Sequence, residues 1–184
     1  MAKWVFEPGH TAAEFCTRHM MVTWIRGCFK NIEGTIEFDP EDPASSSVDV
    51  SIDAASLWSG DEHRDGHLRN SDFLDVENHP KITFKGDEIR LMGSHEFEVI
   101  GDLTIRGKNR KTVLNVRYLG QWETPFWVDG ADKGPIARAG FVAETTINRH
   151  DFGVSWSGTM DKGGVIVGDD VLITIDVEAL QQPD

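Results

Sequence analysis

Apolar and polar side chains alternate along several stretches of this chain with a period of two. In the clearest of them, residues 97–105, the apolar side chains of Phe97, Val99, Leu103 and Ile105 occupy every second position, with Gly101 between them. Residues 48–53, 82–85 and 171–178 repeat the alternation. Successive side chains of a strand point to opposite faces, so this pattern predicts half-buried antiparallel strands. We therefore expect an all-β fold.

Turn-forming residues separate the alternating stretches. Asp39–Pro43, Met92–His95 and Gly107–Arg110 are rich in Gly, Pro, Asp and Asn, which are typical of tight connections between strands. We count roughly eight strands with short connections, a pattern that predicts an antiparallel meander closed into a barrel, or a sandwich. The interior of an eight-stranded barrel is either just filled by side chains or holds one small ligand, and the pattern leaves both open.

Helical sequence is scarce. Residues 59–75 are polar and contain a candidate N-cap, Asp61, so we predict one short helix there. A second short turn is expected at Asn148–Gly153. We see no linker or internal repeat, and we expect a single domain over residues 1–180 with a frayed tail at 181–184.

The chain has 184 residues and a formal net charge of -13. Such a charge repels phosphate backbones, so we exclude nucleic acid as a partner. No apolar run approaches the roughly 20 residues of a transmembrane helix, and the N-terminal residues contain no apolar signal segment, so we expect a cytoplasmic protein. Cys16 and Cys28 lie in apolar stretches and are expected to be buried free thiols.

Several motifs occur in order along the chain, and together they resemble the YceI family. They are Gly9-His10-Thr11, Phe15-Cys16-Thr17-Arg18-His19, Gly27-Cys28-Phe29 with Gly34, Arg64-Asp65-Gly66-His67-Leu68 with Ser71-Asp72-Phe73, Pro80-Lys81-Ile82-Thr83-Phe84, Gly101–Gly107, Asn148–Gly153 and Gly168-Asp169-Asp170-Val171. The resemblance covers nearly the whole chain. The sequence departs from it in Thr11, where Ser is usual, and in the stretch from Trp122 to Ile136. Many family members are exported, whereas from these N-terminal residues we expect no leader.

The resemblance implies an eight-stranded, lipocalin-like barrel with an apolar interior that holds an isoprenoid chain. It also implies a homodimer as a candidate assembly. From it we predict a non-enzymatic protein that binds or transports an isoprenoid quinone or a polyprenyl lipid, with no cofactor beyond such a lipid.

Aromatic side chains are the expected lining of the ligand tunnel, since they bury large areas at few positions. His19 and Arg149 border apolar segments, and their N–H groups suit a polar head group such as a quinone carbonyl. Structural pairing of Arg149 with Asp151 or Asp72 is the alternative. The expected lining residues are Phe15, Trp24, Phe29, Phe38, Phe84, Phe97, Phe141 and Phe152.

A basic stretch interrupts the acidic sequence. Residues 103–122 contain no Asp or Glu. We expect the basic side chains either to dock transiently on an anionic membrane or to form a solvated hairpin tip. The residues proposed for the membrane contact are Arg106, Lys108, Arg110 and Lys111.

Two other functions stay open at this point. His63 and His67 are four residues apart on the expected helix, as a two-histidine metal site requires, although the spacing supplies no third ligand. A metal-dependent enzyme is therefore one alternative. The competing interpretation of the same motif is structural, with Arg64, Asp65 and His67 holding the helix against the barrel end by hydrogen bonds and ion pairs. A small-barrel interaction protein with a filled core is the other alternative. The sequence contains no nucleophile-elbow, Walker or Gly-x-Gly-x-x-Gly motif.

Overall fold

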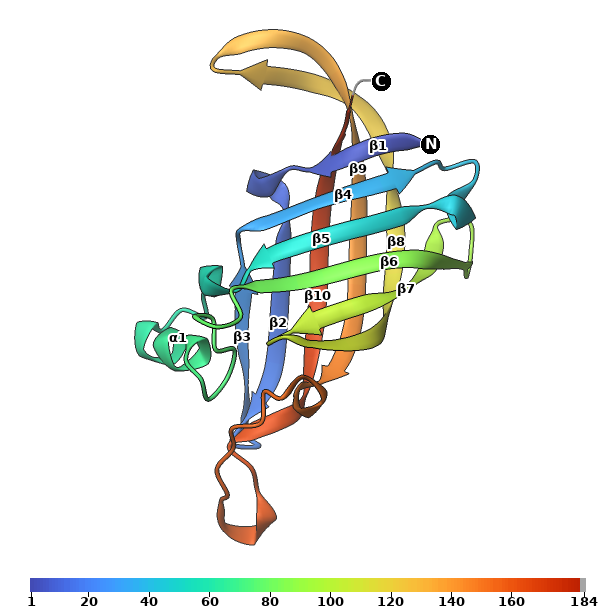
Figure 1. Cartoon of the computed structure of the whole chain (residues 1–184). Helices are drawn as coiled ribbons and strands as arrows, with labels where there is room; N and C mark the ends of the chain where they lie inside the picture. Colours follow the sequence, from blue (N-terminus) through green and yellow to red (C-terminus); the bar gives the residue numbers. More distant parts are fainter. Residues whose placement is uncertain (183–184) are drawn as a thin grey trace.

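The computed structural model describes residues 1–182, which form one antiparallel sheet closed into a barrel (Figure 1). The strands are β1 (Ala2–Phe6), β2 (Ala12–His19), β3 (Thr23–Phe29), β4 (Ile32–Phe38), β5 (Ser47–Asp53), β6 (Lys81–Leu91), β7 (Glu96–Ile105), β8 (Lys108–Val128), β9 (Ala131–Asn148) and β10 (Val167–Gln181). The helix is α1 (Glu62–Arg69), and short 3-10 turns occur at η1 (Pro8–His10), η2 (Pro43–Ser45), η3 (Ala54–Ser56), η4 (Arg149–Phe152) and η5 (Asp161–Gly163).

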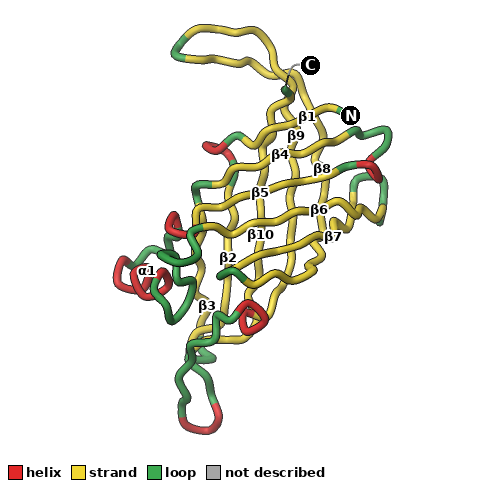
Figure 2. Tube along the Cα trace, viewed as in Figure 1, coloured by secondary structure: helices red, strands yellow, loops and turns green. Residues whose placement is uncertain are grey.

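The ten strand segments of residues 1–182 make an eight-stranded barrel, because two of its strands are interrupted. β1 and β2 follow one another along the same edge of β10, where Phe6 pairs with Ala179 and Ala12 with Asp176. β3 and β4 follow one another beside them. Every later strand pairs with the next in sequence, and the β1–β10 pairing closes the barrel (Figure 2). The predicted fold class is confirmed.

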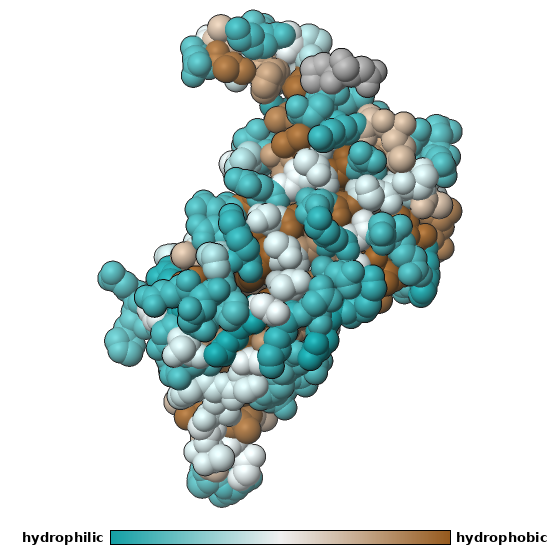
Figure 3. Space-filling view, viewed as in Figure 1, coloured by the Kyte–Doolittle hydropathy of each residue, from teal (hydrophilic) through white to brown (hydrophobic). Residues whose placement is uncertain are grey.

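The period of two corresponds to the two faces of the barrel wall. Along β7, residues 97, 99, 101, 103 and 105 are buried, while those between them are partly exposed. Figure 3 shows the result, a largely hydrophilic outer surface over the barrel wall. The buried side chains form two clusters along the barrel, one towards the α1 end and one around Trp4 and Phe38 at the opposite end.

The turn after β7 lies earlier than predicted. Ile105 pairs with Lys108, so the connection is the dipeptide Arg106-Gly107, and not Gly107–Arg110. Both residues have positive φ, 50° and 69°, as a type I′ hairpin turn requires. Gly107 adopts this conformation without steric cost, and it fixes the turn.

The helix is shorter than the predicted 59–75 segment. Asp61 caps it as expected, its side chain accepting a hydrogen bond from the Arg64 backbone N–H. After Arg69 the Asn70 N–H bonds back to the His67 carbonyl, and Asp75 has a positive φ of 51°. The chain therefore leaves the helix and covers the barrel end as a series of turns. Within residues 1–182 no helix combines the length and apolar character needed to cross a membrane.

β8 and β9 continue past the barrel as a two-stranded ribbon, which projects from the end opposite α1 (Figure 1). This ribbon contains the unusual stretch from Trp122 to Ile136. The ordered chain also continues past the predicted tail boundary. Gln181 pairs with Trp4, and the Gln182 N–H donates to the Lys3 carbonyl, because β10 uses these groups to close on β1. The rest of that predicted tail, residues 183–184, lies outside the described part.

Candidate functional site

The barrel encloses a cavity of about 190 Å³ at the α1 end, which we call cavity 1. Inward-facing residues of β2, β3 and of every strand from β5 to β10 form its wall. Leu57, Leu68, Phe73 and Val154, from the segments that cover this end, complete it. The surface facing the cavity is entirely apolar, so cavity 1 suits hydrocarbon better than a hydrated group.

A smaller cavity of about 100 Å³, cavity 2, lies towards the opposite end. It is lined by Phe38, Phe97 and Phe141 and closed near η2 by Pro43 and Ser46. Its exposed surface is likewise apolar. Phe38 and Phe141 meet edge to face, with ring centroids 5.3 Å apart.

Phe84, Leu114 and Ile175 line both cavities. The two apolar cavities therefore adjoin at these three residues, which we call the waist. The alternative of a barrel with a filled core is therefore wrong, because the interior side chains leave cavities of about 190 Å³ and 100 Å³ on the two sides of these residues.

The structure places the predicted lining residues in three groups. Phe15, Phe29, Phe84 and Phe152 line cavity 1, and Phe38, Phe97 and Phe141 line cavity 2, with Phe84 shared. Trp24 lines neither cavity. It lies on the outer face of β3, 37% exposed, with the Arg18 guanidinium 4.6 Å from its ring centroid. Contact of any of these residues with a ligand stays a prediction.

His19 also lies outside both cavities. It is half-buried at the end of β2, in register with Val167 of β10 and Thr23 of β3. Thr17, two residues earlier on β2, does line cavity 1. His19 is thus close to the end of the cavity without forming its wall.

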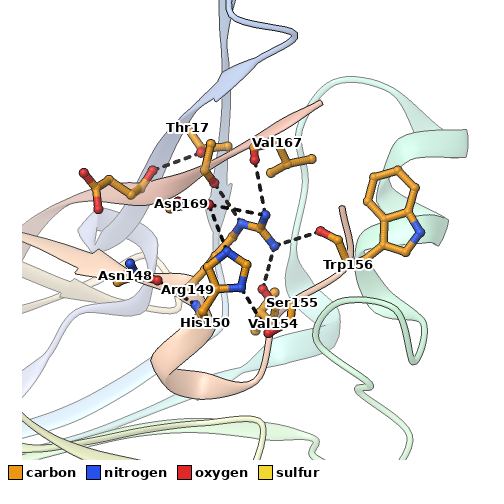
Figure 4. Close-up of polar contacts among 11 residues, drawn as sticks. Thr17, Asn148, Arg149, His150, Val154, Ser155, Trp156, Val167 and Asp169 are labelled. Carbon is orange, nitrogen blue, oxygen red and sulfur yellow. Dashed lines mark hydrogen bonds and ion pairs between the residues drawn. The ribbon is translucent and has the colours of Figure 1, made fainter. Parts of the chain in front are cut away.

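Arg149 lines cavity 1 and is 4% exposed (Figure 4). Its Nη1 donates to the carbonyl oxygens of Val154 at 2.7 Å and Trp156 at 2.8 Å. Its Nε donates to the Gly168 carbonyl at 2.8 Å and its Nη2 to the Val167 carbonyl at 3.2 Å. Four of the five N–H groups of the guanidinium are thereby bound to main chain.

These bonds tie both ends of the loop at residues 154–166 to η4. Asp169 lies 4.0 Å from Nη2 of Arg149, so the expected pairing with Asp151 or Asp72 is replaced by main-chain carbonyls and Asp169. Burial lowers the pKa of the Arg149 guanidinium because the charged form loses hydration, and the charge of Asp169 acts in the opposite direction. His150 reinforces the same loop by bonding Ser155 at 3.1 Å and Asp169 at 2.9 Å (Figure 4).

Three rings cover the outer end of cavity 1. Trp156 of the loop packs against His67 of α1, with centroids 5.0 Å apart, and against Phe73 at 5.4 Å. His67 and Phe73 meet edge to face at 4.9 Å. The helix and the 154–166 loop thus close this end of the barrel together.

The motif around α1 has a structural role. Buried Asp65 accepts hydrogen bonds from the backbone N–H and hydroxyl of Ser59, and Arg64 donates to the hydroxyl and carbonyl of Ser59 at 2.7 Å. His67 Nε2 lies 2.9 Å from a carboxylate oxygen of Asp72. These contacts fix α1 to the segments on either side of it, and Arg69 ties the helix to the turn after β5 by donating to the carbonyls of Ala55 and Leu57.

A metal site on His63 and His67 receives no support from the geometry. Within the described part of the chain, no three His, Cys, Asp or Glu side chains come together as a ligand set. His63 is exposed on α1, while His67 is turned towards Phe73 and Trp156.

The basic hairpin of β7 and β8 is partly committed to the fold. Arg106 donates to the carbonyls of Ser71, Phe73 and Gly153, and Lys111 lies 3.2 Å from Asp102. Lys108 packs against Gly153. Membrane contact through this hairpin stays a prediction.

The lining residues predicted from the sequence were all aromatic, so most aliphatic residues of the cavity walls were not predicted. Leu114 and Ile175 at the waist, and Val167 and Ile173 beyond it, line the cavities without being aromatic. For β10 the signal was available, because Val171, Ile173, Ile175 and Val177 alternate in the sequence. Leu68 and Phe73 could not be found this way, since they come from a polar segment without a strand period.

Comparison with known proteins matches residues 4–179 to the model of the YceI-like domain. A UPF0312 protein of Pectobacterium atrosepticum is 34% identical over 176 residues, covering 96% of this chain and 84% of that protein. The crystal structure of Burkholderia cenocepacia BcnA shares the fold, with 24% identity, a TM-score of 0.78 and coverage of 94% of this chain and 98% of that one. A polyisoprenoid binding domain from Saccharophagus degradans also shares it, with 12% identity, a TM-score of 0.66 and 99% coverage of both chains. The chain therefore belongs to the YceI-like family.

Proposed function

We propose that this protein binds an isoprenoid lipid, an isoprenoid quinone or a polyprenyl chain, and carries it with the hydrocarbon inside the barrel. The observation that carries the proposal is the pair of adjoining cavities with wholly apolar surfaces. The similarity to a polyisoprenoid binding domain and membership of the YceI-like family support it.

The energetics favour recognition of the chain over recognition of the head group. An enclosed apolar cavity of about 150 Å³ already binds benzene, so cavity 1 can take a segment of hydrocarbon. Burial contributes about 0.8 kcal/mol per CH₂, and a long chain gains ample free energy without polar contacts. A chain that occupies both cavities must pass the waist, where Phe84 is the bulkiest of the three side chains.

A head group would lie at the α1 end in this proposal. Arg149 has one Nη2 hydrogen beyond its four main-chain bonds, with Asp169 4.0 Å from Nη2, and a carbonyl or hydroxyl oxygen of the ligand at the edge of the apolar surface would compete with that carboxylate for it. His19, beside Val167 at the same end, is the second predicted donor. Binding is preferred to catalysis because acid–base chemistry needs a titratable group within reach of the substrate. Of the residues lining the two cavities only Glu14 and Arg149 are titratable, and the surfaces that face the cavities are apolar.

Two variants of neighbouring threonines test the proposal. Thr145 lines cavity 1, while Thr146, the next residue of β9, is exposed on the outer face. Thr145→Trp should fill the cavity and abolish lipid binding, and Thr146→Trp should bind as the original protein does. Native mass spectrometry after incubation with menaquinone, ubiquinone or a polyprenol measures the bound fraction.

Chain length gives an independent measurement. Affinity should rise with each added isoprene unit and should change little when the head group is exchanged at constant chain length. Equal binding by the two Trp variants, or no binding of any of the three lipids, would contradict a ligand inside the barrel.

A further inference from the structure

We propose that the turn between β2 and β3, Met20–Val22, is an anchor that inserts into the interfacial layer of a phospholipid bilayer and holds the α1 end of the barrel against it. We call these three residues the tip. The exposed side chains described below are the basis for the docking. The role of the docking, which is to load lipid from the bilayer, rests on the proposed function.

The tip exposes apolar side chains in a conformation that disfavours them. Met20 and Met21 both have positive φ, 49° and 61°, which are the angles of a type I′ turn. Asn and Gly are the usual residues in such a turn, and other residues adopt it at an energetic cost. The side chains gain little burial in return, since Met20 is 41%, Met21 55% and Val22 79% exposed. Strain combined with apolar exposure indicates that these side chains serve a contact outside the chain.

The residues below the tip have the composition of a membrane-interface anchor. Trp24 lies on the outer face of the hairpin under the Arg18 guanidinium, in register with it, and Arg26 follows on the same face beside Cys16. Trp is enriched at membrane interfaces, where its ring packs against acyl chains and its N–H stays near the head groups. An arginine beside it can bind lipid phosphate. From Phe15 to Ile32 the chain contains no Asp or Glu, although its net charge is -13.

Acidic side chains also lie near this surface, on neighbouring elements. Asp169 and Asp170 are in the β10 segment beside β2, and Asp161 is in the loop at residues 154–166, next to Lys162. Asp169 is hydrogen-bonded to His150 and faces Arg149. Acidic and basic side chains around the tip are therefore close to equal in number. Apolar insertion should supply most of the affinity, and anionic lipid should strengthen it through Arg18 and Arg26.

The tip is connected directly to the end of cavity 1. The Met20 N–H donates to the Ile166 carbonyl at 2.8 Å, and His19 pairs with Val167, which lines the cavity. Thr17, another wall residue, is three positions from Met20, a distance of about 10 Å along a strand. Hydrophobic surface is visible at this end, around the β2–β3 turn and the 154–166 loop (Figure 3). A tip held in a bilayer would bring the apolar cavity close to the acyl chains.

The double variant Met20→Asn/Met21→Gly removes both methionines of the tip and leaves Val22, while giving the turn its preferred residues, so it should fold at least as stably. The control is Met92→Asn, since Met92 is 61% exposed in the β6–β7 turn, at the end of the barrel away from α1. Flotation with vesicles of phosphatidylcholine, with and without phosphatidylglycerol, measures the partition coefficient. We expect binding by the original protein and by the control, and at least a tenfold loss in the double variant.

Arg18→Gln should weaken binding to phosphatidylglycerol vesicles more than to phosphatidylcholine vesicles. Unchanged binding by the double variant would overturn the proposal, as would no binding by the original protein. So would a loss confined to Lys108→Gln/Arg110→Gln, which tests the β7–β8 hairpin. A dimer in analytical ultracentrifugation that the double variant dissociates, without any vesicle binding, would assign the tip to a second copy instead.

Lipid binding in vesicle-free solution separates the two proposals. If the tip serves docking alone, the double variant should bind dispersed menaquinone as the original protein does and extract it poorly from vesicles. Vesicle binding without any uptake of menaquinone would leave the anchor standing and contradict the proposed function.

Discussion

The carbonyl oxygen of Val154 accepts a 2.7 Å hydrogen bond from Nη1 of Arg149, a side chain that is only 4% exposed. The same guanidinium binds main chain at the other end of the 154–166 loop. The buried Arg149 therefore fixes the loop that covers cavity 1. A side chain predicted to contact a ligand thus also holds the end of the cavity closed.

Arg149→Lys should destabilise the protein and loosen this loop. A lysine ammonium cannot reproduce the planar fork that reaches several carbonyls at once, and the carbonyls left without donors are costly because they are shielded from water. We expect a loss of about 3 kcal/mol or more in the free energy of unfolding, measured by urea denaturation. Hydrogen exchange should accelerate over residues 154–168. His150→Ala is the control for a more exposed contact to the same loop, and an Arg149→Lys variant as stable as the original would contradict this role.

Phe84→Ala should join the two cavities. Phe84 is 6% exposed and forms the waist with Leu114 and Ile175, so its truncation should cost about 3–5 kcal/mol of stability. Longer isoprenoid chains should bind more tightly relative to short ones, as native mass spectrometry across a chain-length series would show. Phe97→Ala is the matched control, because Phe97 is equally buried and lines cavity 2 alone. The same change in chain-length preference in both variants would rule out a specific waist at Phe84.

Two glycine substitutions should act in opposite directions. A Cβ on Gly101 of β7 would lie 2.2 Å from the Lys85 carbonyl oxygen, so Gly101→Ala must displace backbone and should cost about 1–3 kcal/mol. A Cβ on Gly66 of α1 would meet nothing within 4 Å, and Gly66→Ala should stabilise the helix by up to about 1 kcal/mol. Chemical denaturation of the pair checks both signs, and destabilisation by Gly66→Ala would mean that α1 needs the glycine.

Tyr118 should make the protein sensitive to alkaline pH. Burial raises the pKa of its phenol above the ordinary value, so the folded state retains the proton longer than the unfolded state. Its contribution to stability is complete below about pH 10, the ordinary value for tyrosine, and is lost as the pH rises through the raised pKa. The free energy of unfolding should fall more steeply above pH 10 in the original protein than in Tyr118→Phe. Since the chain has one tyrosine, its ultraviolet absorbance reports the titration directly, and an unshifted titration would refute the effect.

The alternation in the sequence was sufficient to predict strands and their inward faces. Residues 97, 99, 101, 103 and 105 are buried as the period of two requires, and Asp61 caps the helix as its position predicts. The turn at Arg106-Gly107 and the end of α1 at Arg69 were displaced from their predicted positions. Such boundaries depend on strand register and on packing, which local composition does not encode.

The sequence by itself determined the all-β class and most aromatic lining positions, because side-chain alternation and turn residues act locally and dictate which face of each strand is buried. The resemblance to the YceI family, and not the alternation, distinguished a barrel from a sandwich. Only the tertiary structure decided that the interior is hollow, since cavity volume depends on how side chains from six or more strands meet at one point. It also decided that the Arg149 guanidinium binds carbonyls of residues that follow it in sequence, in the covering loop and in β10, and that Trp24 lies on the outside of the barrel. These outcomes follow from long-range pairing and closure of the sheet, which no short stretch of sequence contains.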